Sequence, residues 1–160
     1  MQGSRDGFAA SDFHNKCDNK GATLTLIQST GGYIFGGYTN QSWNSSGYVQ
    51  DAGAFIFTLK NPHNIPPTKY TTTQPQNAIR CYTSYGPMFG SGDIYVYTNS
   101  NQNTSSSTSF PQSYGDSTGK GKLTFTNNNN FQTTEIEVFQ IRKVWVTIQK
   151  RSSMKQETLL

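Results

Sequence analysis

The chain has 160 residues and a formal net charge of +4, with 32% of its residues hydrophobic and 14% charged. This length fits one domain with a single core, and ten phenylalanines, nine tyrosines and two tryptophans supply the large apolar side chains for it. No apolar run approaches the ~20 residues of a membrane span, and no basic stripe carries interleaved aromatic residues. We therefore expect neither membrane insertion nor a nucleic-acid partner.

The cysteine and histidine content predicts a chain without a metal ion or cofactor. Cys17 and Cys81 form no disulfide framework and no zinc pattern, which favours a reduced, cytoplasmic setting. His14 and Cys17 lie three residues apart, so both can reach one metal ion, but no second pair of ligands follows. We interpret Cys17 as a core residue and His14 as its polar neighbour.

The chain begins with a helical pattern and continues with β-structure. Residues 5–21 are expected to form a short helix with an entry turn, because apolar side chains recur on one narrow stripe. Residues 23–28 and 33–38 alternate on either side of a glycine-containing turn, which predicts a β-hairpin with Leu24 and Leu26 on one face.

A polar loop and a strongly apolar strand follow the hairpin. Residues 40–53 are expected to form the loop, which the indole of Trp43 pins to the body. Residues 54–59 carry apolar side chains on both faces, which predicts a central strand between two layers. The proline-rich residues 60–76 are expected to run over the surface.

The glycine-rich stretch at residues 86–93 is the sharpest local signal in the chain. A phosphate-binding loop has to open a helix, whereas this stretch opens a strand at residues 94–97 and matches no phosphate-binding pattern. We interpret it as a tight corner in a sheet, with a further strand expected just before it at residues 78–83.

The second half of the chain is less regular. Residues 98–122 are rich in Asn, Ser and Thr, and so long a connection is functional, mobile or hides short strands. Short strands are expected at residues 123–125 and 135–141, and Val144, Val146 and Ile148 alternate as one more strand would.

These elements predict a mainly β (α+β) fold, a two-layer antiparallel β-sandwich with a few short peripheral helices. We assign residues 1–141 to the domain and residues 142–160 to a C-terminal extension. Five basic residues and one acid follow Ile141, so the domain is neutral and the extension carries the whole positive excess. Such a basic end is typical of a solvated segment.

Several segments together resemble the TLDc domain, the module of the oxidation-resistance proteins. The segments that carry the resemblance lie in order from residue 4 to residue 141: Ser-Arg-Asp-Gly-Phe at 4–8, the helix motif at 13–21, the hairpin at 23–27 and 35–38 with Trp43, the strand at 54–59, the glycine stretch at 86–95, and Ile-Glu-Val-Phe at 136–139. One departure is Ala9, which stands where relatives often carry a serine that caps the helix.

The resemblance implies a non-catalytic interaction domain. Members of the family protect cells from oxidative damage, and several bind the vacuolar proton-pumping ATPase and alter its assembly or activity. We therefore expect this chain to act on that pump in the stress response. Because loops on a rigid scaffold usually carry binding, the candidate contact residues are these six: Trp43, Gly90, Ser91, Gly92, Asp93 and Glu137.

Two alternative functions remain open from the sequence. Glu135 and Glu137 lie two apart on one strand face, about 7 Å from each other, a spacing at which carboxylates serve as acid and base in sugar hydrolysis. The chain also ends in a threonine two residues before Leu160, the pattern that PDZ domains bind. A hydrolase and a PDZ-binding adaptor are therefore the competing interpretations.

Overall fold

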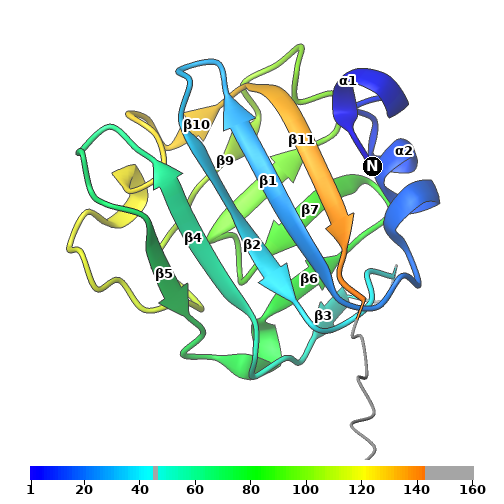
Figure 1. Ribbon diagram of the computed structural model, residues 1–160, viewed down its shortest axis with the longest axis horizontal. Helices are drawn as coiled ribbons and strands as arrows, with labels where there is room; N and C mark the ends of the chain where they lie inside the picture. Colours follow the sequence, from blue (N-terminus) through cyan, green and yellow to red (C-terminus); the bar gives the residue numbers. More distant parts are fainter. Residues whose placement is uncertain (45–46, 143–160) are drawn as a thin grey trace, which may run out of the picture.

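The computed structural model describes residues 1–44 and 47–142, and within them two antiparallel β-sheets pack face to face (Figure 1). The predicted β-sandwich is therefore confirmed. The first sheet has five strands in the order β11 (Thr133–Gln140), β1 (Thr23–Ser29), β2 (Ile34–Thr39), β4 (Phe55–Lys60) and β5 (Thr68–Thr71). The second has six, in the order β10 (Asn130–Phe131), β9 (Ser106–Ser107), β8 (Ile94–Tyr97), β7 (Tyr85–Phe89), β6 (Ile79–Cys81) and β3 (Gly47–Val49).

The helices lie at the periphery, as expected. The single helix predicted for residues 5–21 is two pieces, α1 (Gly3–Asp6) and α2 (Ala10–Cys17), which Figure 1 shows beside β11 at one edge of the sandwich. The helix α2 stops four residues before Gly21 because Asp18 turns extended and the N–H of Asn19 donates to the carbonyl of Trp43 at 3.0 Å. No helix in residues 1–44 and 47–142 is long and apolar enough to cross a membrane.

The irregular segments hold more structure than the sequence indicates. The loop at residues 40–53 contains β3, and the low-complexity stretch at 98–122 hides β9, one of the outcomes that its length predicts. The strand expected at residues 123–125 is wrong: a 3-10 helix, η2 (Gly121–Leu123), lies there. A second 3-10 helix, η1 (Pro75–Asn77), leads into β6. The strand predicted at residues 144–148 lies outside the described residues.

Aromatic rings from both sheets fill the space between the layers. Phe35 of β2 packs edge to face on Phe131 of β10 with ring centroids 5.3 Å apart, and Trp43 packs in the same way on Phe89 of β7 at 5.4 Å. Gly37 is the reason that Phe89 fits, since a Cβ atom at residue 37 would lie 2.5 Å from that ring. The core is therefore built mainly from large rings that smaller residues accommodate.

Candidate docking surface

The outer face of the five-stranded sheet carries a set of apolar side chains that, with the exception of Phe57, are half-buried or exposed within residues 1–44 and 47–142. In Figure 1 this sheet lies at the front, with the second sheet behind it and both α-helices at its β11 edge. Leu59 and Phe139 are 45% and 46% exposed. The side chains that share this face are the following: Leu24, Leu26, Ile34, Tyr38, Phe55, Phe57, Leu59 and Phe139. We call these residues the outer apolar face.

Strand pairing sets these residues out in rows across the sheet. One row runs from Glu137 through Leu26, Gly36 and Phe57 to Lys69. At its centre a Cβ atom on residue 36 would collide with the carbonyl oxygen of Thr25 and lie 3.2 Å from the ring of Phe57. The row therefore has a glycine at its centre, apolar side chains on either side, and opposite charges at its two ends.

The second row is aromatic. It runs from Phe139 through Leu24, Tyr38 and Phe55 to Thr71. The rings of Tyr38 and Phe55 are stacked with centroids 5.1 Å apart, and the ammonium of Lys69 lies 4.7 Å from the centre of the Phe55 ring. Exposed apolar patches of this kind mark interaction sites on soluble proteins.

The core-facing sides of β1 and β4 explain why the apolar set points outward. Thr25 and Ile27 of β1 and Ile56 and Thr58 of β4 are fully buried. Successive side chains of a strand point to opposite faces. Because threonines of β1 and β4 face the aromatic interior, the leucines and phenylalanines of these strands lie on the outer face. The prediction that residues 54–59 form a central strand covered on both faces is confirmed in part: β4 is interior to its sheet and Phe57 on its outer side is only 7% exposed, but Leu59 on the same side is 45% exposed.

The two glutamates of the hydrolase alternative lie at the β11 edge of the outer apolar face. Glu137 lines a hollow of about 130 Å³ together with Glu135 and Leu26. This volume is well below the ~300 Å³ at which small-molecule pockets begin. The carboxylate of Glu135 already accepts hydrogen bonds from the N–H of Ser4 at 2.9 Å, from the Ser4 hydroxyl and from the Gln2 amide.

These bonds give Glu135 a structural role at the start of the chain. Burial alone would raise the pKa of its carboxyl, but the hydrogen bonds from Ser4, Ile136 and Gln2 lower the pKa on balance. A general acid in sugar hydrolysis needs the opposite shift. The geometry therefore fits Glu135 as the residue that fastens α1 to the sheet.

The glycine stretch is a corner, as predicted, but its carboxylate points inward. The corner follows β7, with Gly90 and Gly92 at φ of +67° and +103°. Asp93 is fully buried, and its carboxylate accepts the backbone N–H groups of Gln112 at 2.7 Å and Ser113 at 2.9 Å. Burial raises the pKa of Asp93, and these hydrogen bonds only partly offset that effect. Asp93 therefore anchors the protein's own loop and is not exposed for a partner.

The other predicted contact residues differ in whether they are buried or lie near a surface. Trp43 is 1% exposed, and its indole N–H donates to the hydroxyl of Thr23 at 2.9 Å, so the ring pins its loop to the body and offers no surface. Ser91 is half-buried and accepts a hydrogen bond from the Tyr48 hydroxyl. Of the predicted contact residues, only Glu137 belongs to the edge of the outer apolar face.

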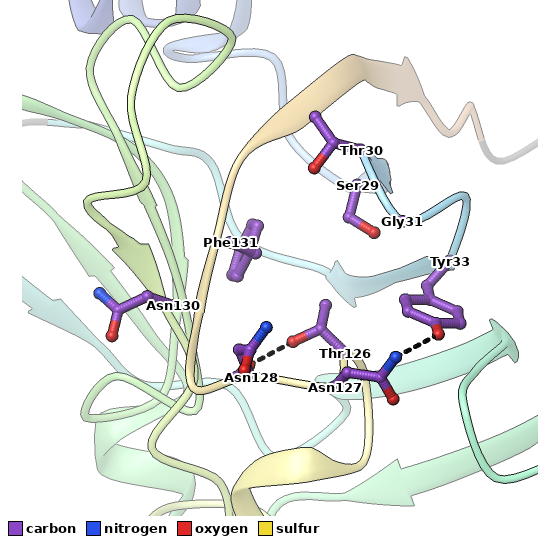
Figure 2. Close-up of a pocket in the computed structure, with 9 residues that line it drawn as sticks. All are labelled: Ser29, Thr30, Gly31, Tyr33, Thr126, Asn127, Asn128, Asn130 and Phe131. Atoms are coloured by element: carbon purple, nitrogen blue, oxygen red, sulfur yellow. Dashed lines mark hydrogen bonds between the residues drawn. The ribbon is translucent and has the colours of Figure 1, made fainter.

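A second hollow, of about 190 Å³, lies between the β1–β2 turn and the segment before β11 (Figure 2). Its lining carries no charged side chain and combines polar groups with the rings of Tyr33 and Phe131. The amide of Asn127 donates to the hydroxyl of Tyr33 at 2.7 Å, and Thr126 donates to the carbonyl of Asn128. Figure 2 shows the side chain of Asn130 pointing away from the hollow. It too falls short of the volume of an ordinary ligand pocket.

His14 and the two thiols face the interior of the molecule. His14 places one ring nitrogen 2.8 Å from Asp18 and the other 2.8 Å from the carbonyl oxygen of Tyr82. Burial raises the pKa of Cys17 and of Cys81 to about 11, so both thiols are neutral near pH 7. These residues join α2 to the second sheet and to the core.

Comparison with known proteins identifies the family. A family model described as the TLDc domain matches residues 2–142, so the chain belongs to the TLDc domain family. The chain is also similar to the protein named MTOR-associated protein MEAK7 from Danio rerio, with 41% identity over 44 residues. That match covers 27% of this chain and 10% of the relative, so the chain spans only a small part of it.

The outer apolar face itself was not found from the sequence. The available signal was that β1 and β4 each carry two usable sets of alternate residues, one of them the Leu24 and Leu26 pair. Alternation shows which residues share a face, and it does not show which face meets the second sheet.

Proposed function

We propose that this chain is a protein-interaction domain that acts by binding, without chemistry of its own, and that its partner is the vacuolar proton-pumping ATPase. The observation that carries the proposal is the outer apolar face, which is built into the sheet of a domain whose family is established. Family resemblance supplies the pump as the partner and oxidative-stress protection in the cytoplasm as the setting.

Two features of the structure and one comparison support binding over catalysis. The carboxylates of Glu135 and Asp93 are both engaged in holding the protein's own backbone. The two hollows described above are small and open onto the surface. The relative's printed name describes an association with another protein, which agrees with a binding role.

The test is a binding measurement between the purified chain and the purified vacuolar pump, with Phe139→Asp as the variant. Phe139 is half-exposed on β11, so the substitution places a charge on the outer apolar face with little effect on the core. We expect at least tenfold weaker binding, because hot-spot residues contribute about 2 kcal/mol or more and 1.4 kcal/mol is a factor of ten.

The matched control is Leu123→Asp. Leu123 is 42% exposed, but it belongs to η2 and not to the sheet. This variant should bind like the unaltered chain. If the unaltered chain leaves the pump unbound and its ATPase rate unchanged, the pump is the wrong partner; if both variants bind normally, the outer apolar face is the wrong surface.

The hydrolase alternative is separated by Glu137→Gln. A charge-neutral glutamine keeps the shape of the side chain but removes the only carboxylate of the pair that is free of α1. Peroxide survival of cells that carry this variant should equal that of cells with the unaltered chain. A complete loss of protection with unchanged pump binding would favour the hydrolase.

A further inference from the structure

The opposite side of the sandwich carries a second surface of different chemistry. Among the six strands of the second sheet, Arg80 of β6 is the only charged residue. Tyrosines surround it on the outer side of that sheet. These tyrosines come from β3, β7, β8 and the β6–β7 turn: Tyr48, Tyr82, Tyr85, Tyr95 and Tyr97. We call the five tyrosines and Arg80 the tyrosine–arginine face.

The arginine is held between rings. Tyr48 pairs with Arg80 across β3 and β6, and the centre of its guanidinium lies 4.9 Å from the centre of the Tyr48 ring and 4.6 Å from that of Tyr82. One N–H group donates to the Tyr82 hydroxyl at 3.0 Å. The flat guanidinium is therefore fixed in place by cation–π contacts before any partner arrives.

The guanidinium of Arg80 forms no ion pair within the part of the chain that the structure describes. The ion pairs in residues 1–44 and 47–142 involve Arg5, His14 and Lys16, and none involves Arg80. Its Nε–H is enclosed and has no acceptor among the described residues. A guanidinium has five N–H donors in a fork that matches the two oxygens of a carboxylate. Within residues 1–44 and 47–142, the Tyr82 hydroxyl is the one acceptor hydrogen-bonded to the guanidinium of Arg80.

The tyrosines extend the surface beyond the arginine. Tyr85 packs against Tyr95 with ring centroids 5.0 Å apart and lies 6.0 Å from Tyr97, and all three side chains are half-buried. Tyrosine and arginine are the residues that dominate the binding energy of protein interfaces. Nucleic acid would require many cations along its backbone, whereas this face has one.

We propose that the tyrosine–arginine face binds an acidic segment of a partner protein, with a glutamate or aspartate carboxylate paired to the guanidinium of Arg80 and neighbouring residues lying on Tyr95 and Tyr97. This surface belongs to the other sheet and is independent of the outer apolar face. It gives the domain a second, electrostatically selective contact, so that it can hold two partners or two parts of one.

The test is a titration of the purified chain with a short peptide of glutamate and glycine, followed by NMR on the Nε–H signal of Arg80 and by fluorescence anisotropy of the labelled peptide. We expect a saturable shift of that signal, together with the ring protons of Tyr95 and Tyr97. The shift should be absent with a lysine–glycine peptide of the same length.

Two substitutions locate the site. Arg80→Lys keeps the charge but loses the planar fork, and it should weaken peptide binding at least tenfold. The matched control is Arg5→Lys, because Arg5 is exposed and already paired with Asp6 at 2.9 Å, and its binding should be unchanged. Tyr48→Ala, at an exposed ring on the edge strand β3, should also weaken binding while leaving the core intact.

Three results would overturn the proposal. The first is an Arg80 signal that does not shift at peptide concentrations up to millimolar. The second is an Arg5→Lys variant that binds the peptide as weakly as Arg80→Lys does. The third is oligothymidylate that binds more tightly than the peptide and with the same dependence on Arg80. The last result would make the face a platform for single-stranded nucleic acid. None of these measurements uses the vacuolar pump, so the outcome is separate from that of the proposed function.

Discussion

Replacing Asp93 with alanine should be one of the most destabilising substitutions at a polar residue of this domain. The carboxylate is fully buried and accepts three backbone N–H groups from the loop that follows β9, those of Gln112, Ser113 and Tyr114. Alanine leaves these donors without their acceptor. The bonds from Ser113 and Tyr114 are buried, so water cannot replace the carboxylate there.

The size of the effect follows from those two buried donors. A buried donor left without a partner costs about 1–3 kcal/mol, so the substitution should lower the free energy of unfolding by roughly 4 kcal/mol. Because 1 kcal/mol moves the melting temperature of a domain this long by about 2–4 °C, the midpoint should fall by about 8–16 °C. This is a large part of the ~5–15 kcal/mol that stabilises an ordinary domain.

The chain supplies its own control in Asp116. That carboxylate also accepts three backbone N–H groups, from Thr118, Gly119 and Gly121, but in a loop that solvent reaches. Asp116→Ala should cost about 1 kcal/mol or less, since water can take over the exposed donors. Urea unfolding followed by tryptophan fluorescence measures both values. An equal cost for the two substitutions would refute the argument from burial.

Three further predictions concern the helix, the core and the thiols. Ala9→Ser should raise the free energy of unfolding by about 1 kcal/mol, because a serine there can cap the N–H groups of α2; thermal denaturation measures it. Gly37→Ala should lower the free energy of unfolding by about 1–3 kcal/mol, because the added methyl group would collide with the Phe89 ring. Urea unfolding measures this loss. The thiols of Cys17 and Cys81 should react with Ellman's reagent at pH 8 only on unfolding. Since burial raises their pKa to about 11, their contribution to stability is present below pH ~9 and is lost as the pH rises towards 11; rapid reaction of the folded chain would contradict this.

The order of the elements and the two-layer architecture could be predicted because each strand carries its own local signal. The run from residue 135 to residue 141 alternates clearly and forms β11, and the hairpin of β1 and β2 follows from the turn between Ser29 and Ile34. The glycine corner is likewise a local property, since Gly90 and Gly92 both need positive φ.

Long-range contacts account for the features that the sequence did not predict. The end of α2 at Cys17 depends on Trp43, which lies 26 residues further along the chain and accepts the N–H of Asn19. The role of Asp93 depends on a loop 19–21 residues away. The indole of Trp43 pins its loop as the sequence predicts, whereas the inward direction of Asp93 becomes clear only in the fold, because Asp93 lies in a polar, loop-like stretch.

The faces that β1 and β4 turn towards the core bear on both stability and binding. Burying Thr25 and Thr58 leaves their hydroxyls enclosed without a hydrogen-bond partner in the described part of the chain, which is unfavourable. Turning Leu24 and Phe55 outward gives up apolar burial as well. Stability alone would select the reverse assignment of polar and apolar residues on these strands. A partner that covers the leucines and aromatic rings of this face would explain why the sheet keeps them outside at such a cost. The binding test with Phe139→Asp and Leu123→Asp measures whether a partner does so.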